Sequence, residues 1–202
     1  AEAGCRLITF GIESCDDAVL EKIKKGATQE QTVKTLAWAR EVGMPAKASM
    51  MLALPGDTPE SLFRTIDGIV DLAPEYIQFN MTIPFPYTEL WDTAEKEGVL
   101  PANFEWDYFM LSDFYKVSLS DEEKDKFPFF VPPSFTKKEL FELYSLAIEL
   151  PKWSAYKRGF RSNPIRTALG AARHPIRFAS AVRAHTKYQA LKRRKLQKGA
   201  VA

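Results

Sequence analysis

RLITFGIESCDDAVLEKIKKGAT, residues 6–28, is the stretch that decides the fold. Its first eight residues alternate between apolar and small or polar side chains, with Ile8, Phe10 and Ile12 on one side. This two-residue period predicts a strand over 6–13. A short helix over 16–25 is expected next, ended by Gly26. A strand followed at once by a helix is the first half of a βαβ unit.

Two more units of the same kind follow along the chain. Thr28 and Gln31 have the spacing of a capping box, which predicts the start of a helix. We expect a strand over 47–54, a helix that Thr58 caps, and a third strand over 76–82. This alternation predicts parallel strands joined by right-handed crossovers, and therefore an α/β fold.

The expected strands are polar on one face, which is unusual for parallel strands that serve only as structure. Glu13, Asp57 and Asn80 fall near the carboxyl ends of the three strands. Ligands of α/β proteins bind at that end, so a site is expected there, although Glu13 and Asn80 could instead cap loops. Three strands cannot close a barrel, so the sheet needs strands from outside this sequence.

Composition and charge limit the function classes. The chain has 202 residues and two cysteines, and it lacks the roughly 18 consecutive apolar residues of a membrane-spanning helix. Residues 1–150 hold 14 basic and 26 acidic residues, a net charge of −12, whereas residues 151–202 hold 14 basic and no acidic residues. We expect a cytoplasmic protein whose basic tail performs a different task from the body.

Three motifs carry a family resemblance. They are GCRLITFGIESCDDAVLEKIKKGAT at 4–28, MMLALPGDTPESLFRTIDGIV at 50–70 and PEYIQFNMTIPFPYTELWDTAEKEG at 74–98. Their order and spacing resemble the second half of a radical S-adenosylmethionine core domain. The nearest resemblance is to the cobalamin-binding branch, which includes enzymes similar to the anaerobic Mg-protoporphyrin IX monomethyl ester cyclase.

The resemblance implies the carboxyl-terminal half of a partial (β/α)6 TIM-like barrel, with strands four to six in this chain. It implies that S-adenosylmethionine contacts the residue that ends strand four, the turn after strand five and the inner face of strand six. Those positions are Glu13, Ser14, Met51, Ala53, Leu54, Pro55, Gly56, Gln78 and Asn80. A carboxylate suits the first position, since it accepts hydrogen bonds from a ribose diol or an ammonium group. No catalytic residue is assigned.

The sequence departs from the family pattern at several places. Ala53 stands where the family often has Gly, Asp57 where it often has Glu, and Tyr87 where the loop is usually PGT. Cys15 and Asp16 replace a Gly-Ser that often follows the strand-four Glu-Ser.

The resemblance implies a 4Fe–4S cluster held by a C-x3-C-x2-C motif, which Cys5 and Cys15 cannot form. We therefore expect the cluster ligands, and any cobalamin domain, to lie outside this chain. Cys5 is expected to be a small buried hydrophobe and Cys15 a loop cysteine at the site end. No metal site is expected at His174 and His185, whose segment has no thiol or carboxylate.

Three segments are expected: a half-barrel over 1–98, an aromatic-rich helical region over 99–150 and a basic helical tail over 151–202. The aromatic residues are read as an accessory core or as a wall for a flat substrate. They are Trp91, Trp106, Tyr108, Phe109, Phe114 and Tyr115.

The tail is expected to be helical over 161–198, with a break at His174–Pro175. An apolar stripe recurs at helical spacing among cations, at Ile165, Leu169, Ala172, Ile176, Ala179 and Val182. Either this segment docks peripherally on an anionic membrane surface, or it folds back onto the acidic body. Nucleic acid is the less expected partner.

The resemblance implies a fragment of a radical S-adenosylmethionine iron–sulfur enzyme, a transferase or oxidoreductase that methylates or cyclises an unactivated carbon. Its substrate would be a tetrapyrrole, a lipid or another small molecule, and its first partner the missing amino-terminal half of the barrel. The alternatives are a tRNA-modifying enzyme of the methylthiotransferase kind and a non-catalytic truncated subunit that serves as an interaction or anchoring module.

Overall fold

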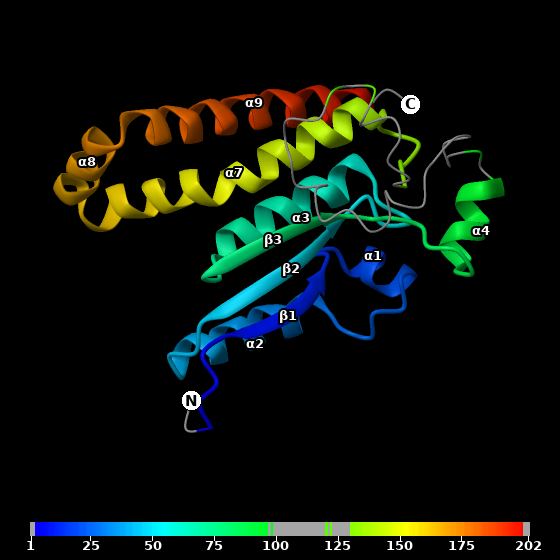
Figure 1. Ribbon diagram of the computed structural model, residues 1–202, viewed down its shortest axis with the longest axis horizontal. Helices are drawn as coiled ribbons and strands as arrows, with labels where there is room; N and C mark the ends of the chain where they lie inside the picture. Colours follow the sequence, from blue (N-terminus) through cyan, green and yellow to red (C-terminus); the bar gives the residue numbers. More distant parts are fainter. Residues whose placement is uncertain (1–2, 97, 99–119, 121, 123–129, 200–202) are drawn as a thin grey trace.

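The computed structural model describes residues 3–96, 98, 120, 122 and 130–199. Three strands form a parallel sheet in the order β1–β2–β3 (Figure 1). They are β1 (Ile8–Glu13), β2 (Ala46–Leu52) and β3 (Tyr76–Met81). The crossovers contain α1 (Asp17–Lys22), α2 (Gln29–Glu41) and α3 (Pro59–Leu72). The predicted α/β class and the parallel order of the strands are confirmed.

The crossover helices begin where their capping residues predict. The Thr28 hydroxyl accepts a hydrogen bond from the Gln31 backbone N–H, and the Gln31 side-chain oxygen accepts one from the Thr28 backbone N–H. Thr58 and Ser61 make the same exchange at the start of α3, with Pro59 in the first turn. Such reciprocal bonds satisfy two backbone groups that a helix end would leave unpaired.

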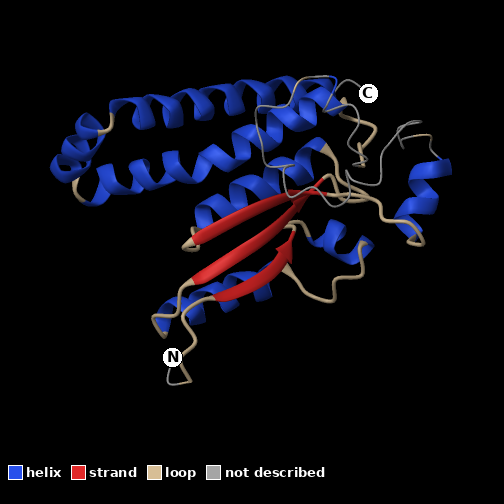
Figure 2. Ribbon diagram, viewed as in Figure 1, coloured by secondary structure: helices blue, strands red, loops and turns tan. Residues whose placement is uncertain are grey.

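One face of the sheet is apolar and carries the core. Met50 and Leu52 of β2 and Phe79 of β3 are buried against Leu62 and other apolar residues of α3. The residues between them in sequence point to the opposite face and remain half-buried or exposed. The helices α2, α3 and α7 (Lys137–Ser162) lie on the apolar side, so these three helices leave the polar face uncovered (Figure 2).

A long helical hairpin follows the sheet and occupies residues 137–199. α7 runs away from the carboxyl end of the sheet, α8 (Pro164–Arg173) turns the chain, and α9 (Pro175–Gly199) returns beside α7 (Figure 2). Pro151 lies inside α7, which therefore continues across the predicted boundary at residue 150. The break at His174–Pro175 is confirmed.

Polar contacts attach α9 to the body. The hydroxyl of buried Tyr188 donates to Asp67 of α3 at 2.9 Å, and Lys192 pairs with the same carboxylate. Lys195 pairs with Glu139 of α7 and donates to the Ser134 carbonyl. This half of the basic tail therefore folds back onto the acidic body, which is one of the two arrangements that the sequence left open.

Several expectations need correction or lie outside the described residues. Cys5 is exposed, so its prediction as a buried hydrophobe is wrong; it precedes β1, where no described element covers it. The spacing of apolar residues in α2 predicts an apolar face of Val33, Leu36 and Ala37, but the buried residues are Leu36 and Ala39, and Val33 is exposed. Trp91 belongs to α4 (Glu89–Lys96), while the aromatic residues predicted over 106–115 fall outside the description. Within the described segments, no helix is long and apolar enough to cross a bilayer.

Candidate functional site

Hydrogen-bonded side chains cross the polar face of the sheet. The Asn80 amide on β3 donates to the Ser49 hydroxyl of β2 at 3.2 Å and to the Met50 carbonyl at 3.3 Å. The Gln78 amide donates to the Asn80 carbonyl oxygen at 2.9 Å. Since each bond fixes its partner's rotamer, this row is a preformed polar surface rather than a set of loose side chains.

Glu13 ends β1 in a left-handed conformation, with φ 68°, at a register irregularity between Gly11 and Glu13. Its carboxylate lies over Gly11 and accepts a hydrogen bond from the Lys25 ammonium at 3.0 Å. A Cβ at Gly11 would approach the Glu13 Oε1 atom to 2.7 Å. The glycine therefore makes room for a partly buried ion pair at the carboxyl end of the strand.

The turn after β2, residues 53–57, is held by internal hydrogen bonds, and we call it the shelf. Ala53 has a left-handed φ of 65°. The Asp57 carboxylate accepts hydrogen bonds from the Leu54 backbone at 2.8 Å and from the Ser61 hydroxyl at 2.7 Å. Burial raises the pKa of Asp57 to about 6, although both hydrogen bonds oppose the shift. Asp57 therefore stabilises the turn through a buried carboxylate that bonds both the turn backbone and the first turn of α3.

A pocket of about 710 Å³ opens beside this shelf. Leu54, Pro55 and Gly56 form one wall, and residues of α4 and of the segment before α7 form others. Two cations at the rim, Lys22 and Lys24, come from the end of α1. The remaining lining residues are Ile23, Asp57, Thr82, Thr88, Glu89, Leu90, Thr93, Phe130, Pro132 and Pro133. Its volume lies in the usual range for small-molecule sites.

The structure divides the predicted contact residues into three groups. Glu13, Met51, Gln78 and Asn80 lie on the polar face of the sheet, and Leu54, Pro55 and Gly56 line the pocket. Ser14 and Ala53 are buried and belong to neither group. The Ser14 hydroxyl bonds the Thr65 hydroxyl at 2.8 Å and accepts from the Asp16 backbone at 3.1 Å, so its described bonds are internal.

Sequence reasoning missed Lys25, the ion-pair partner of Glu13. Its signal lay in the first motif, where a Lys-Gly pair follows the first helix and brings a cation to the loop before Thr28. It also missed Lys22, whose stem crosses Gly56 so closely that a Cβ there would lie 2.5 Å from the Lys22 Cδ atom. Nothing in the local pattern indicates that second approach.

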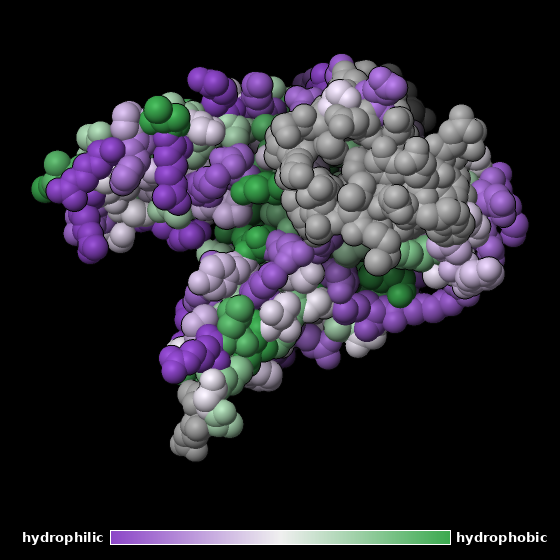
Figure 3. All heavy atoms as spheres, viewed as in Figure 1, coloured by the Kyte–Doolittle hydropathy of each residue, from purple (hydrophilic) through white to green (hydrophobic). Residues whose placement is uncertain are grey.

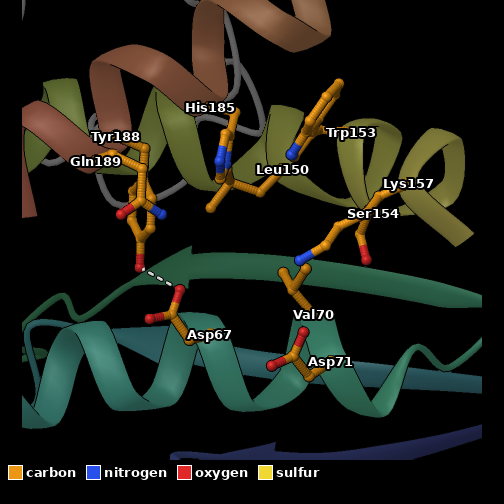
Figure 4. Close-up of a pocket in the computed structure, with 10 residues that line it drawn as sticks. All are labelled: Asp67, Val70, Asp71, Leu150, Trp153, Ser154, Lys157, His185, Tyr188 and Gln189. Atoms are coloured by element: carbon orange, nitrogen blue, oxygen red, sulfur yellow. Dashed lines mark hydrogen bonds between the residues drawn. The ribbon is translucent and has the colours of Figure 1, made fainter.

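A smaller hollow of about 230 Å³ lies between α3, α7 and α9 (Figure 4). His185 stacks on Trp153 with ring centroids 5.3 Å apart, and the Tyr188 hydroxyl points to Asp67. Desolvation and then the Lys157 charge lower the pKa of His185, against a smaller opposing effect of Asp67. These groups serve the docking of α9, on the helical side of the sheet rather than on its polar face.

The cysteines do not fit the iron–sulfur cluster of the resemblance. Cys5 is exposed and Cys15 is fully buried against Gly68. Burial raises the pKa of Cys15 to about 11, so its thiol is a poor ligand and a poor nucleophile. The described part of the chain contains no group of three His, Cys, Asp or Glu side chains placed to hold a metal ion.

Comparison with known proteins supports the family resemblance of the sequence motifs. Residues 1–69 match the family model of the Radical SAM superfamily. An uncharacterised methyltransferase of Pyrococcus horikoshii is 30% identical over 156 residues, which cover 73% of this chain and 34% of the relative. A putative methylthiotransferase of Methanocaldococcus jannaschii is 27% identical, over 68% of this chain and 32% of the relative. The heme chaperone HemW of Bacillus subtilis is 29% identical, over 47% and 25%.

The chain spans about a third of the length of the first two relatives. The match to the family model begins at residue 1 and covers β1, β2 and most of α3, which are the elements that carry Glu13 and the shelf. By the family-model match over residues 1–69 and by these relatives, the chain is similar to members of the radical S-adenosylmethionine superfamily.

Proposed function

We propose that this chain is the S-adenosylmethionine-binding, carboxyl-terminal half of a radical enzyme of the cobalamin-dependent type. It would modify an unactivated carbon of a tetrapyrrole, a lipid or another small molecule by methylation or cyclisation. The observation that carries the proposal is the pairing of polar groups on one face of the parallel sheet. Glu13 pairs with Lys25 at the end of β1, and Asn80 of β3 bonds Ser49 of β2.

The residues present fit the nucleoside. The Glu13 carboxylate can accept from a ribose diol or from the ammonium group, and Lys25 beside it can donate to a carboxylate. The bonded Gln78–Asn80 pair offers amides to polar edges, and Leu54 and Pro55 offer an apolar wall for a flat base. S-adenosylmethionine would supply the radical precursor for hydrogen abstraction; this chain would bind and orient it.

The residues do not fit the cluster, because one cysteine is exposed and the other is buried. We therefore expect that the isolated 202-residue chain, after anaerobic reconstitution, binds no stoichiometric 4Fe–4S cluster. Iron and sulfide analysis measures this. A fully occupied cluster ligated within one chain would contradict the division of the enzyme into a cluster-binding half and a nucleoside-binding half.

The decisive experiment uses the complete protein, with the segment that supplies the remaining strands and the C-x3-C-x2-C motif. Glu13→Gln should weaken S-adenosylmethionine binding about ten- to a hundredfold, because a hydrogen bond to a charged group contributes roughly 1.5–3 kcal/mol. Glu30→Gln is the matched control, since Glu30 is an exposed carboxylate of α2 that pairs with Lys34. Equilibrium dialysis measures affinity, and 5′-deoxyadenosine formation measures activity.

Unchanged affinity in the Glu13→Gln protein would contradict the assignment of this residue. Binding without any 5′-deoxyadenosine, in a protein with a full cluster, would favour the alternative of a non-catalytic subunit.

A tRNA-modifying enzyme is the second candidate, favoured by the relative named as a putative methylthiotransferase. It predicts saturable tRNA binding by the complete protein and product formation on the tRNA. The same 5′-deoxyadenosine assay, run with and without tRNA, separates the two candidates. Added tRNA should stimulate 5′-deoxyadenosine formation if tRNA is the substrate, and should have no effect if the substrate is a small molecule.

A further inference from the structure

The α8 end of the helical hairpin presents large aliphatic side chains to solvent. Ile165 and Leu169 lie four residues apart on α8 and share a face, and they are 75% and 58% exposed. Ile176, in the first turn of α9, is 85% exposed. Single exposed apolar residues are ordinary, but three large aliphatic side chains within residues 165–176 concentrate apolar surface at this end of the hairpin; we call them the patch.

The opposite side of α8 is already used for packing. Ala171 is buried, and Thr167 lies so close to α7 that a Cβ at Gly159 would approach its hydroxyl to 2.7 Å. α8 is therefore held against α7 by one face, and Ile165 and Leu169 point outward as a consequence of that packing.

Exposed cations surround the patch. Arg161, Arg166, Arg173 and Arg177 have no carboxylate within 4.0 Å in the described chain, and residues 151–202 contain no acid. By contrast, Lys192 and Lys195 near the end of α9 pair with Asp67 and Glu139 of the body. Uncompensated positive charge is therefore present at the α8 end, where hydrophobic and hydrophilic groups lie side by side (Figure 3).

The position of α8 separates it from the candidate site. α7 starts near the carboxyl ends of the strands and runs toward their amino ends, so α8 lies at the far end of the hairpin (Figure 1). A partner at α8 would leave the polar face and the 710 Å³ pocket accessible.

From these observations we infer that residues 161–177, the α8 tip, dock the protein on an anionic lipid surface. Aliphatic side chains would enter the headgroup region while arginines contact lipid phosphates and carboxylates. The expected docking segment of 161–198 narrows to the α8 tip, because the later part of α9 packs on the body.

Lipid fits this surface better than RNA does. Base recognition by a basic surface usually needs open aromatic faces for stacking. The aromatic rings near the tip instead pack on one another: Phe178 contacts Trp153, Tyr156 and Phe160 with centroids 5.0–6.4 Å apart. The exposed apolar groups at the tip are aliphatic, which suits a bilayer interface.

Flotation of the 202-residue chain with vesicles tests the inference. The probe is phosphatidylcholine with about 30% phosphatidylserine, against pure phosphatidylcholine. We expect flotation with the anionic vesicles only, and a loss of binding at high salt. The triple change Ile165→Ser, Leu169→Ser, Ile176→Ser should lower the partition coefficient about tenfold or more. The matched control is Val33→Ser, Trp38→Ser, Val42→Ser, which removes three exposed apolar residues of the α2 region.

A polarity-sensitive dye places the contact directly. Ile176→Cys in a Cys5→Ser background can be labelled selectively, because Cys15 is buried and its thiol is unreactive. Emission of the labelled chain should shift to the blue with anionic vesicles, whereas the same dye at Val42→Cys should not respond. Equal flotation with neutral vesicles, an unaffected triple variant, preferential RNA binding at matched salt, or self-association that the triple variant abolishes would each overturn the inference.

Discussion

Ala53 and Tyr87 hold left-handed backbone conformations in two turns at the carboxyl end of the sheet, with φ 65° and 67°. These are two positions where the radical S-adenosylmethionine pattern often has glycine. Alanine and tyrosine stand at these positions instead of glycine, yet the backbone keeps the left-handed conformation that glycine adopts without strain. Each residue therefore stores strain, and the two differ in what their side chains contribute.

Tyr87 is fully exposed, so replacing it removes strain at little cost in packing. Tyr87→Gly should raise the free energy of unfolding by about 1 kcal/mol relative to Tyr87→Ala, because alanine keeps the left-handed penalty. Chemical denaturation of both variants measures the difference. Ala53→Gly should be nearly neutral, since the buried methyl lost there offsets the relief. Equal stability of the two Tyr87 variants would show that this turn is not strained.

Asp57 gives a pH-dependent prediction. Its pKa in the folded chain is about 6 against an ordinary value of 3.8, so the folded state binds the proton more tightly. The free energy of unfolding should therefore fall as the pH rises from about 4 to about 6, by roughly 2–3 kcal/mol from this group. Asp57→Asn, which can still accept from Leu54 and donate to Ser61, should abolish that part of the pH dependence.

Denaturation of both proteins between pH 4 and pH 7 tests this prediction, because the difference between the two curves isolates residue 57. A constant difference across this range would show that Asp57 does not titrate as the structure implies.

At the level of single residues, sequence identified the capping groups and the carboxylate at the end of β1. Thr28 and Thr58 act within a few residues of their own positions, and Glu13 ends a strand that the local period predicts, so local pattern is sufficient to place them. Lys25 reaches Glu13 across a turn, and Lys22 crosses Gly56 from another element. Such partners depend on tertiary packing, which a one-dimensional pattern does not contain.

Among the helices, α9 packs on the body through buried apolar residues and adds one buried hydroxyl and a few ion pairs. Tyr188 packs edge-to-face on Phe63 with ring centroids 5.6 Å apart, and it bonds Asp67. Desolvation, and then the nearby Asp67 charge, raise the pKa of Tyr188 well above its ordinary range, so its hydroxyl stays protonated and donates. The network joins α9 to α3 across the hollow of Figure 4.

Tyr188→Phe should lower the free energy of unfolding by about 1.5–3 kcal/mol, because Asp67 loses a hydrogen bond while the ring packing remains. Tyr76→Phe is the control, since Tyr76 is exposed on β3. Thermal or chemical denaturation followed by circular dichroism measures both. Equal effects of the two changes would mean that Lys192 alone holds the Asp67 carboxylate.

The sequence pattern predicted that helices form in the tail, but it did not predict which helices pack against each other. The break at His174–Pro175 follows from backbone restrictions of proline, and the structure has it. The continuation of α7 through Pro151 does not follow from local rules, because packing of Leu150 and Ser154 overrides the missing backbone bond. The return of α9 along α7 depends on long-range contacts that the apolar stripe leaves undetermined.

On the scale of the whole molecule, the described chain is a sheet with helices on one side and a polar surface on the other. A parallel sheet whose polar face is joined by side-chain hydrogen bonds is suited to a ligand rather than to a second apolar layer. The charge division of the sequence is partly neutralised where α9 meets the body, and it persists at the α8 tip.

The most direct test of the central claim is a titration of the isotopically labelled 202-residue chain with S-adenosylmethionine, followed by backbone amide chemical shifts. The account predicts the largest shifts at Gly11, Glu13, Met51, Gly56 and Asn80, which lie on the polar face and the shelf. It predicts no significant shifts around the helical hollow, at Asp67, Trp153 and His185. Shifts confined to that hollow, or none at saturating ligand, would contradict the claim that the polar face binds the nucleoside.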